Sequence, residues 1–84
     1  MTPEDIRKLA LDLLGGIAPE ADLSALGGND ELREVLDIDS MDFLNFIAAL
    51  HKATGIDIPE ADYRQLFTLA GIVRYLGEGP AGQG

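Results

Sequence analysis

The sequence predicts an all-α fold, a small four-helix bundle with a long loop between its first two helices. Apolar residues recur three and four positions apart in several segments, and residues typical of helix starts precede them. No segment of useful length alternates with the two-residue period of a β-strand. The 84 residues suffice for one domain, which we expect over residues 1–77, followed by a flexible glycine-rich tail over 78–84.

The first helix is predicted over residues 3–15. Thr2 can cap its start, and Pro3 suits the first helical position. Gly15 and Gly16 follow, and because glycine commonly ends helices, we expect this helix to stop there. One apolar stripe is expected to face the core, formed by Ile6, Leu9, Ala10, Leu13 and Leu14.

Residues 16–38 are predicted to form a long loop, in which residues 30–36 can make a short turn of helix. A connection of this length is unusual in so small a domain and often has a function. Three apolar side chains are expected to hold the loop against the core, namely Ile17, Leu23 and Leu26.

The second strong helix is predicted over residues 39–53. Asp39 or Ser40 can cap its start. Phe46 and Met41 widen its apolar sector beyond a single stripe. Four residues are expected to face the core, namely Phe43, Leu44, Ile47 and Leu50.

Two further helices are predicted after Gly55, which stands where the second helix ends. Pro59 begins a short third helix, and Thr68 caps a fourth that runs to about Leu76. The inward face of the fourth helix is predicted to hold Leu69, Ile72, Val73 and Leu76. We expect two tyrosines at the edge of the core with their hydroxyls in solvent, Tyr63 and Tyr75.

The charge balance narrows the classes of partner. Six Lys and Arg residues stand against fifteen Asp and Glu residues, which gives a net charge of −9. Such a field repels DNA, RNA and anionic membrane surfaces, and it favours partners with a basic face. Six of the acids lie within residues 30–42, where Arg33 is the single cation: Asp30, Glu31, Glu34, Asp37, Asp39 and Asp42.

Composition also excludes several kinds of chemistry. The chain has no cysteine and a single histidine, His51, so we expect no disulfide, thiol nucleophile or metal site. The longest apolar run, Phe46 to Leu50, is far shorter than the roughly 18 residues of a membrane span. The acidic N-terminal segment lacks the apolar region of a secretory signal, so a cytoplasmic location is expected.

Ser40 stands at the predicted start of the second helix, between Asp39 and Asp42. A helix N-terminus carries unpaired N–H groups and the positive end of the helix dipole, so it tolerates an attached anion such as a phosphodiester. The alternative is that Ser40 is only a helix cap. Spacing alone favours the cap and leaves both interpretations open.

A family resemblance alters that balance. The run Asp39-Ser40-Met41-Asp42 resembles the Asp-Ser-Leu-Asp signature of acyl carrier proteins, whose serine carries 4′-phosphopantetheine derived from coenzyme A. The segment from Gly55 to Pro59 is similar to the family's Gly-Ile-Glu-Ile-Pro, and Thr68 to Leu76 resembles its Thr-Val-Gly-Asp-Ala-Val-Asp-Tyr-Ile. The order of helices over residues 3–76 also resembles the family's.

The resemblance implies a carrier rather than an enzyme. Ser40 would bear the phosphopantetheine between Asp39 and Met41, hold an acyl group as a thioester and present it to partner enzymes, as in fatty acid biosynthesis. The implied partners are a phosphopantetheinyl transferase and acyl-loading and acyl-transferring enzymes with basic docking patches, and the carrier is expected to be a monomer. Partner contacts are assigned to Asp37, Asp39, Met41, Asp42, Asn45 and Lys52. An acyl pocket is assigned to Leu44, Ile47, Ile58, Leu66, Ala70 and Ile72.

The chain departs from the family pattern at several positions. Asp37 stands where glycine is common, Asn45 where glutamate is common, and His51 and Lys52 replace part of a glutamate cluster. Phe43 replaces a small polar residue. These departures indicate a specialised carrier with its own partners. We expect Phe43 to be partly buried, Met41 partly exposed and His51 solvated on the helix surface.

His51 is too far from Ser40 to act as its base. Eleven residues at 1.5 Å each separate them by about 16 Å along a helix, whereas a base must lie within about 3 Å. The base is therefore expected from a separate transferase. Two alternatives stay open: an acidic helical interaction module in which Ser40 is only a cap, and a carrier of aminoacyl or polyketide cargo.

Overall fold

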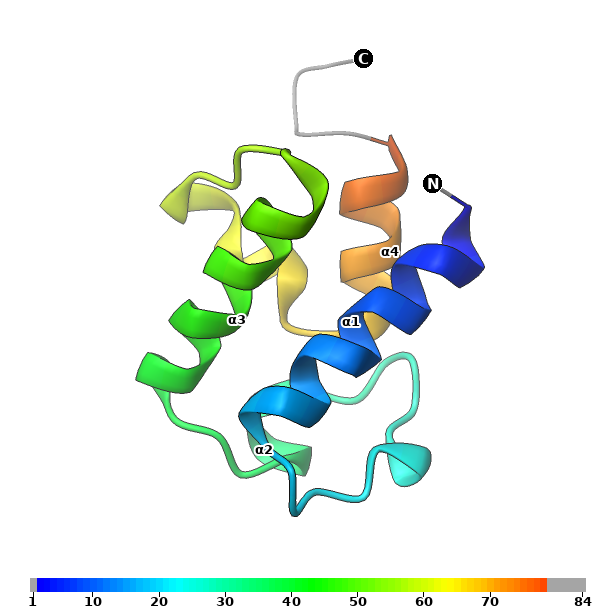
Figure 1. Ribbon diagram of the computed structural model, residues 1–84, viewed down its shortest axis with the longest axis vertical. Helices are drawn as coiled ribbons and strands as arrows, with labels where there is room; N and C mark the ends of the chain where they lie inside the picture. The colour runs from blue at the N-terminus through cyan, green and yellow to red at the C-terminus, as the bar shows by residue number, and fades with distance from the viewer. Residues whose placement is uncertain (1, 79–84) are drawn as a thin grey trace.

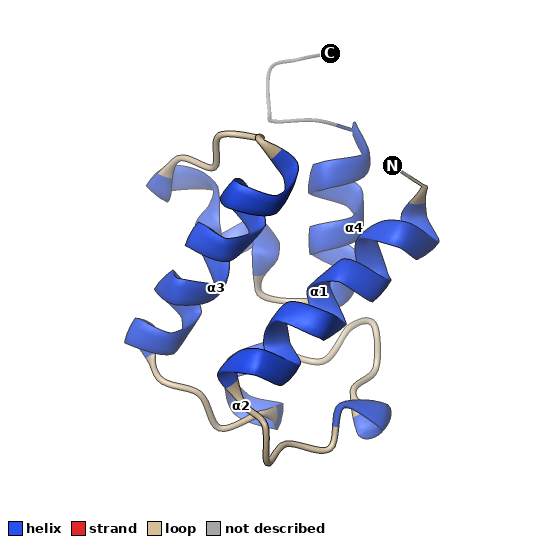
Figure 2. Ribbon diagram, viewed as in Figure 1, coloured by secondary structure: helices blue, strands red, loops and turns tan. Residues whose placement is uncertain are grey.

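The computed structural model describes residues 2–78, and every regular element in that range is helical (Figure 2). The α-helices are α1 (Pro3–Ile17), α2 (Leu32–Val35), α3 (Ser40–Thr54) and α4 (Leu69–Glu78), and two 3₁₀ helices are η1 (Leu23–Ala25) and η2 (Glu60–Leu66). The predicted all-α fold is confirmed. None of the helices in this range is long and apolar enough to cross a membrane.

Helix α1 packs against both α3 and α4, and η2 packs against α4 (Figure 1). The core lies between these elements because each turns its apolar stripe toward the others. The largest side chains that are fully enclosed come from all four elements and from α2: Ile6, Leu14, Leu32, Phe46, Leu50, Leu66, Leu69 and Ile72.

Helix α1 begins as predicted and ends later than predicted. The Thr2 Oγ1 accepts a hydrogen bond from the Asp5 N–H at 3.1 Å, and Pro3 is the first helical residue. The helix continues through both glycines to Ile17, so the predicted end at residue 15 is wrong by two residues. The apolar stripe explains the extension, because Ile17 packs against the core one turn beyond the buried Leu14.

The long connection between α1 and α3 is joined to the rest of the molecule by its backbone as well as by its side chains. The Ala70 N–H donates to the Gly28 carbonyl at 2.9 Å, and the Leu32 N–H donates to the Phe67 carbonyl at 2.8 Å. Leu26 is buried in the core, while Ile17 and Leu23 are partly buried against it. Helix α2 forms within residues 30–36, where a short turn of helix was predicted.

Helix α3 buries three of the four residues predicted to face the core, Phe43, Ile47 and Leu50. Leu44 was expected inside but is 48% exposed, whereas Phe46 is completely buried. Counted from Phe43, the positions i+3, i+4 and i+7 are Phe46, Ile47 and Leu50, and Leu44 lies 100° off that line. Phe43 itself is buried rather than partly buried.

The end of α3 and the start of α4 lie at the residues predicted to set them. Gly55 adopts the left-handed conformation, with φ of 73°, and ends α3. The Thr68 hydroxyl accepts a hydrogen bond from the Gly71 N–H at 3.0 Å and so caps the start of α4. Helix α4 extends to Glu78, and the remainder of the predicted tail lies outside the described residues.

Tyr75 corrects an expectation about the core. Its hydroxyl was expected in solvent, but the side chain is buried and the hydroxyl donates a hydrogen bond to the Asp62 carboxylate at 2.7 Å. Burial, reinforced by the Asp62 carboxylate, raises the pKa of Tyr75 to about 12. The contact joins η2 to α4, where a buried hydroxyl requires a partner. Tyr63 is partly buried, as expected of an edge residue.

Candidate functional site

Asp39, not Ser40, caps helix α3. The Asp39 Oδ1 accepts a hydrogen bond from the Asp42 N–H at 2.8 Å, and Asp39 has the extended backbone conformation of a capping residue. Ser40 is the first residue inside the helix and is exposed. Within residues 2–78, no hydrogen bond engages its hydroxyl. The interpretation of Ser40 as a helix cap is therefore wrong.

Ser24, the other serine of the chain, differs from Ser40 because its hydroxyl is hydrogen-bonded. The Ser24 hydroxyl donates to the Asp22 Oδ1 at 2.5 Å, and the Ser24 N–H donates to the same oxygen at 3.1 Å. Both serines follow an aspartate closely in a helical start, yet only Ser24 has its hydroxyl bound to that aspartate. Ser40 thus presents an accessible hydroxyl beside the unpaired N–H groups of a fifteen-residue helix.

The turn that delivers Ser40 contains an unusual backbone conformation. Asp37 has a φ of 54°, in the left-handed region that favours glycine. The turn buries the next residue, Ile38, in the core and leaves Asp39 and Ser40 at the surface. The sequence placed Asp37 where the family commonly has glycine, and this backbone conformation gives a physical reason for that preference.

The side chains assigned to partner contact surround the start of α3 and extend along it. Among the large apolar residues of the described range 2–78, Met41 is the most exposed, at 69%, and Leu44 and Val35 are also exposed. Asp42 is partly buried. The other assigned residues are exposed: Asp37, Asp39, Asn45 and Lys52.

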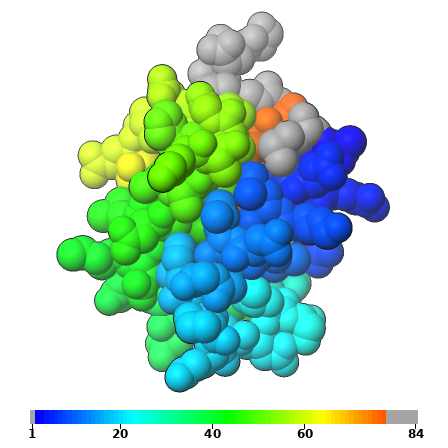
Figure 3. Space-filling view, in the orientation of Figure 1, coloured from blue at the N-terminus to red at the C-terminus, as the bar shows by residue number. Residues whose placement is uncertain are grey.

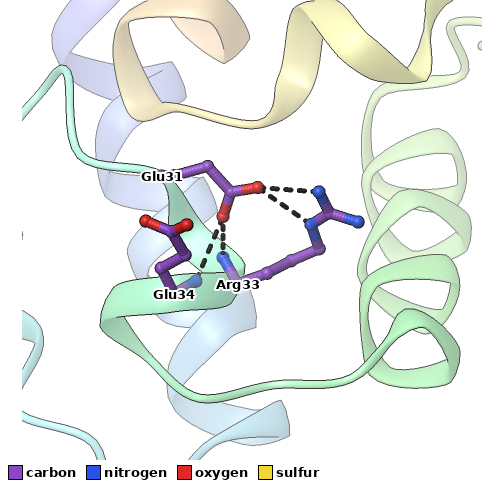
Figure 4. Close-up of polar contacts among 3 residues, drawn as sticks. All are labelled: Glu31, Arg33 and Glu34. Atoms are coloured by element: carbon purple, nitrogen blue, oxygen red, sulfur yellow. Dashed lines mark hydrogen bonds and ion pairs between the residues drawn. The ribbon is translucent and has the colours of Figure 1, made fainter.

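Arg33, the single cation in the acidic segment, is bound to one of its neighbours (Figure 4). The Glu31 Oε1 lies 2.9 Å from both Nε and Nη2 of Arg33, and its Oε2 accepts from the backbone N–H groups of Arg33 and Glu34 at the start of α2. Partial burial tends to raise the pKa of Glu31, but these hydrogen bonds outweigh it and lower the pKa below its usual value.

The Arg33 guanidinium also covers two aromatic rings. Its central carbon lies 4.2 Å from the centre of the Phe67 ring and 6.0 Å from that of Phe43. Arg33 is thus paired with Glu31 and stacked on Phe67, so it does not neutralise the aspartates near Ser40. The sequence showed Arg33 only as one positive charge among six acids and did not reveal this pairing.

A groove of about 360 Å³ runs beside α3. Three of the six predicted acyl-pocket residues line it, and the other three lie elsewhere. Leu66 and Ile72 are completely buried in the core, and Ala70 lines a separate hollow. The groove residues are Leu44, Ile47, Ala48, His51, Asp57, Ile58, Pro59 and Tyr63.

His51 is half-exposed at the far end of this groove from Ser40. Its Nδ1 lies 2.9 Å from the Ile56 carbonyl oxygen and 3.6 Å from an Asp57 carboxylate oxygen. A carbonyl oxygen can only accept, so Nδ1 carries the hydrogen and Nε2 is the acceptor of the neutral ring. Helix α3 is continuous from Ser40 to His51, which keeps the two about 16 Å apart along the helix axis.

A second hollow, of about 400 Å³, lies between the end of α1 and the start of α3, and the sequence gave no sign of it. Its lining combines apolar residues with three acids, Glu20, Asp37 and Asp42. Among the described residues, no three histidine or acidic side chains converge closely enough to hold a metal ion.

The family model described as "Phosphopantetheine attachment site" matches residues 4–76, most of the chain. A comparison with curated proteins found no match.

Proposed function

The chain belongs to the phosphopantetheine attachment-site family, and on that premise we propose that Ser40 is the residue that bears the prosthetic group. Members of this family are carriers rather than enzymes, and they hold 4′-phosphopantetheine covalently. They interact with partner enzymes and with the transferase that attaches the group. When bound, the group supplies the thiol on which cargo is held as a thioester, which accounts for a carrier without cysteine.

One observation carries the assignment of Ser40. Its hydroxyl is exposed at the first position of α3 because the neighbouring Asp39 performs the capping. The residues fit the group, since the N–H groups of the first helical turn favour a phosphodiester while the exposed hydroxyl leaves room for a transferase. Ser24 lacks these properties, because its hydroxyl is bound to Asp22.

The residues of the chain itself orient and expose the serine but do not activate it. A serine hydroxyl needs a base within about 3 Å to attack phosphorus, and His51 is about 16 Å away along α3. The base and the Mg²⁺ that the reaction requires are therefore supplied by the transferase. Asp39 contributes by occupying the cap position, which leaves the Ser40 hydroxyl unbound.

Intact mass spectrometry tests the assignment. The purified protein is incubated with coenzyme A, Mg²⁺ and a promiscuous phosphopantetheinyl transferase. We expect a gain of one phosphopantetheinyl group in the wild type and in the matched control Ser24→Ala, and no gain in Ser40→Ala. A gain that survives Ser40→Ala, or no gain in the wild type with several transferases, contradicts the proposal.

We also propose that the acidic residues and exposed apolar side chains around Ser40 form the partner-docking surface. The space-filling view shows α3 along one flank of the molecule, next to the connection that contains α2 (Figure 3). Met41 supplies an apolar anchor, and Asp37, Asp39 and Asp42 supply charge that suits basic patches on partners. Asn45 and Lys52 continue this surface along α3 and make it less acidic there.

The proposal includes an acyl cargo of lipid metabolism, with aminoacyl and polyketide cargo as the alternatives. The replacement of family glutamates by Asn45, His51 and Lys52 supports a specialised carrier rather than a general fatty-acid carrier. If general fatty-acid synthesis enzymes load and elongate this protein as efficiently as their own carrier, that specialisation is refuted. A monomeric state and a cytoplasmic location remain predictions from the sequence.

A further inference from the structure

We infer that this carrier holds a short acyl group with a hydrogen-bond donor at its distal end, in the open groove beside α3, and does not enclose a long alkyl chain in the bundle. The inference rests on the proposed function of Ser40. It follows from three features of the chain: the aromatic cluster at the first turns of α3, the alignment of the groove with Ser40, and the polar groups at the far end of the groove.

Aromatic rings fill the space into which a long chain would have to pass. The Phe43 ring centre lies 5.3 Å from that of Phe67 and 6.4 Å from those of Phe46 and Tyr63. These rings connect the first turn of α3, η2 and the approach to α4. Protein interiors are packed as densely as organic crystals, so an alkyl chain could enter only by displacing these contacts.

The outer side of this aromatic cluster is also covered. The Arg33 guanidinium lies over the Phe67 ring and is held there by two contacts of 2.9 Å to Glu31. In the core itself, Leu66 and Ile72 are completely buried. Entry of a chain would therefore have to disturb the Arg33–Glu31 pair as well as the rings.

The groove offers a surface path along α3 that begins at Leu44, one helical turn beyond Ser40. The α3 residues of the groove are Leu44, Ile47, Ala48 and His51, which follow Ser40 by 4, 7, 8 and 11 residues and therefore lie on one face of α3. Extended backbone advances roughly 3.5 Å over three covalent bonds. At that rate, the extended 4′-phosphopantetheine group spans roughly 16 Å from the serine oxygen to its sulfur. This reach matches the separation of about 16 Å between Ser40 and His51 along the axis.

The cargo would therefore begin where the apolar part of the groove ends. There it meets the His51 ring and the Asp57 carboxylate rather than further alkyl side chains. Because Nδ1 of His51 is committed to the Ile56 carbonyl, Nε2 of the neutral ring is the nitrogen that can accept a hydrogen bond from the cargo. A hydroxyl or an ammonium group supplies such a donor, and the neighbouring Asp57 favours the ammonium.

A series of acyl groups attached to Ser40 tests the inference. The transferase is supplied with acetyl-, butyryl-, 3-hydroxybutyryl-, 3-aminobutyryl- and dodecanoyl-coenzyme A. Loading is confirmed by mass, methyl and amide NMR spectra are recorded, and the rate of thioester cleavage by hydroxylamine is measured. We expect the dodecanoyl form to be cleaved as fast as the acetyl form, with the Leu66 and Ile72 methyl signals unmoved.

The ¹⁵N NMR signal of His51 tests the polar end of the groove separately. We expect the ¹⁵N signal of His51 Nε2 to shift in the hydroxy or amino form and to remain in place in the butyryl form, and the larger shift identifies the preferred donor. In His51→Leu the differences in amide shifts between these forms should disappear, whereas the adjacent control Lys52→Gln should retain them. Identical spectra for the butyryl, hydroxy and amino forms refute the inference that the cargo donates a hydrogen bond to His51.

The aromatic block is tested with Phe43→Leu, which keeps an apolar side chain and removes the ring. In this variant alone, the dodecanoyl group should enter the bundle and slow cleavage by hydroxylamine. Protection of the wild-type dodecanoyl thioester by roughly tenfold, about 1.4 kcal/mol, together with shifted Leu66 and Ile72 methyls, overturns the inference. Failure of every coenzyme A substrate to load Ser40 refutes the proposed function instead, and the inference with it.

Discussion

At the scale of single residues, the accessibility of Ser40 depends on its neighbour. The Asp39 carboxylate accepts the hydrogen bond from the Asp42 N–H, a role that a serine at the helix start can also perform. Since the aspartate occupies the cap, the serine hydroxyl is left for chemistry at the surface. The motif Asp39-Ser40 thus separates two tasks, stabilising α3 and carrying the prosthetic group.

Asp37 is predicted to be a site of stored backbone strain. Its left-handed φ of 54° costs most side chains about 1 kcal/mol or more, and aspartate somewhat less. We expect Asp37→Gly to raise the free energy of unfolding by about 0.5–1 kcal/mol, because glycine adopts this conformation without strain. Urea denaturation measures the change.

Two matched variants separate strain from charge at the same position. Asp37→Asn removes the carboxylate but tolerates the left-handed conformation, so its stability should stay near that of the wild type. Asp37→Ala removes the carboxylate and also tolerates the conformation poorly, so it should be the least stable of the three. Equal stability of the glycine and alanine variants would contradict the assignment of strain.

The buried hydroxyl of Tyr75 predicts a dependence of stability on alkaline pH. Burial and Asp62 raise the pKa of Tyr75 from 10.0 to about 12 in the folded protein. Below the unfolded value both states keep the proton, so the stabilisation is complete. As pH rises from about 10 toward 12, the unfolded chain binds fewer protons, and this stabilisation is lost.

Tyr75→Phe should therefore reduce the loss of stability in that pH range. At neutral pH the variant should be less stable by roughly 1 kcal/mol, because the hydrogen bond to Asp62 is removed. Urea midpoints measured from pH 8 to 11 test both expectations. The control Tyr63→Phe leaves the Tyr75 hydroxyl in place, so it should lose as much stability at alkaline pH as the wild type.

At the scale of elements, α4 can approach η2 closely because Gly71 has no side chain. A Cβ atom at position 71 would lie 2.0 Å from the carbonyl oxygen of Gln65. This contact involves backbone, which cannot rotate away, so α4 would have to move. Gly16, inside α1, is the opposite case, because nothing lies within 4 Å of a Cβ placed there.

The two glycines should respond to alanine with opposite signs. Gly71→Ala should destabilise the protein by about 1–3 kcal/mol or more through the clash with Gln65. Gly16→Ala should stabilise it by about 0.5–1 kcal/mol, since alanine has the higher helix propensity and the site is open. Thermal unfolding followed by circular dichroism measures both, and destabilisation by Gly16→Ala would show that α1 needs its second glycine.

The positions of the helices were largely predictable from the sequence. Which face of each helix is buried was less predictable. Capping residues and apolar spacing correctly indicated α1, α3 and α4, because these signals are local. They did not indicate that α1 would continue past Gly15, since glycine permits a helix end without requiring one. Packing against the core decided that boundary.

At the scale of the whole molecule, the acidic charge does not prevent a compact fold. The radius of gyration is 11.7 Å, close to the roughly 12 Å expected for a compact domain of this length. The long connection contributes to this compactness, because Leu26, Leu32 and Leu36 are part of the core. The charge is thus carried on the surface, where it is available to partners.

Docking is predicted to depend on salt and on the charge next to Ser40. Raising the salt above about 0.1 M, where the Debye length is about 10 Å, should increase the KM of the transferase for this protein. Asp39→Asn keeps the cap but removes the charge, so at low salt it should increase KM roughly two- to fivefold, with less effect at high salt.

The matched control for this prediction is Asp12→Asn, which removes an exposed carboxylate of α1. It makes the net charge less negative by the same one unit as Asp39→Asn, so it should leave KM nearly unchanged if docking occurs at α3. Equal effects of the two variants would indicate attraction by overall charge rather than by the surface around Ser40.

The sequence by itself determined the all-α class, the order of the helices, the position of Ser40 at the start of α3 and the acidic segment before it. These features depend on local signals such as capping, periodicity and charge. Only the tertiary structure decided that Asp39 is the cap, that Leu44 faces outward while Phe46 is buried, and that Tyr75 bonds Asp62. It also distributed the six predicted pocket residues between a groove, the core and a separate hollow. Those outcomes depend on which surfaces α1, η2 and α4 cover, and side chains distant in sequence set that coverage by filling the space between the helices.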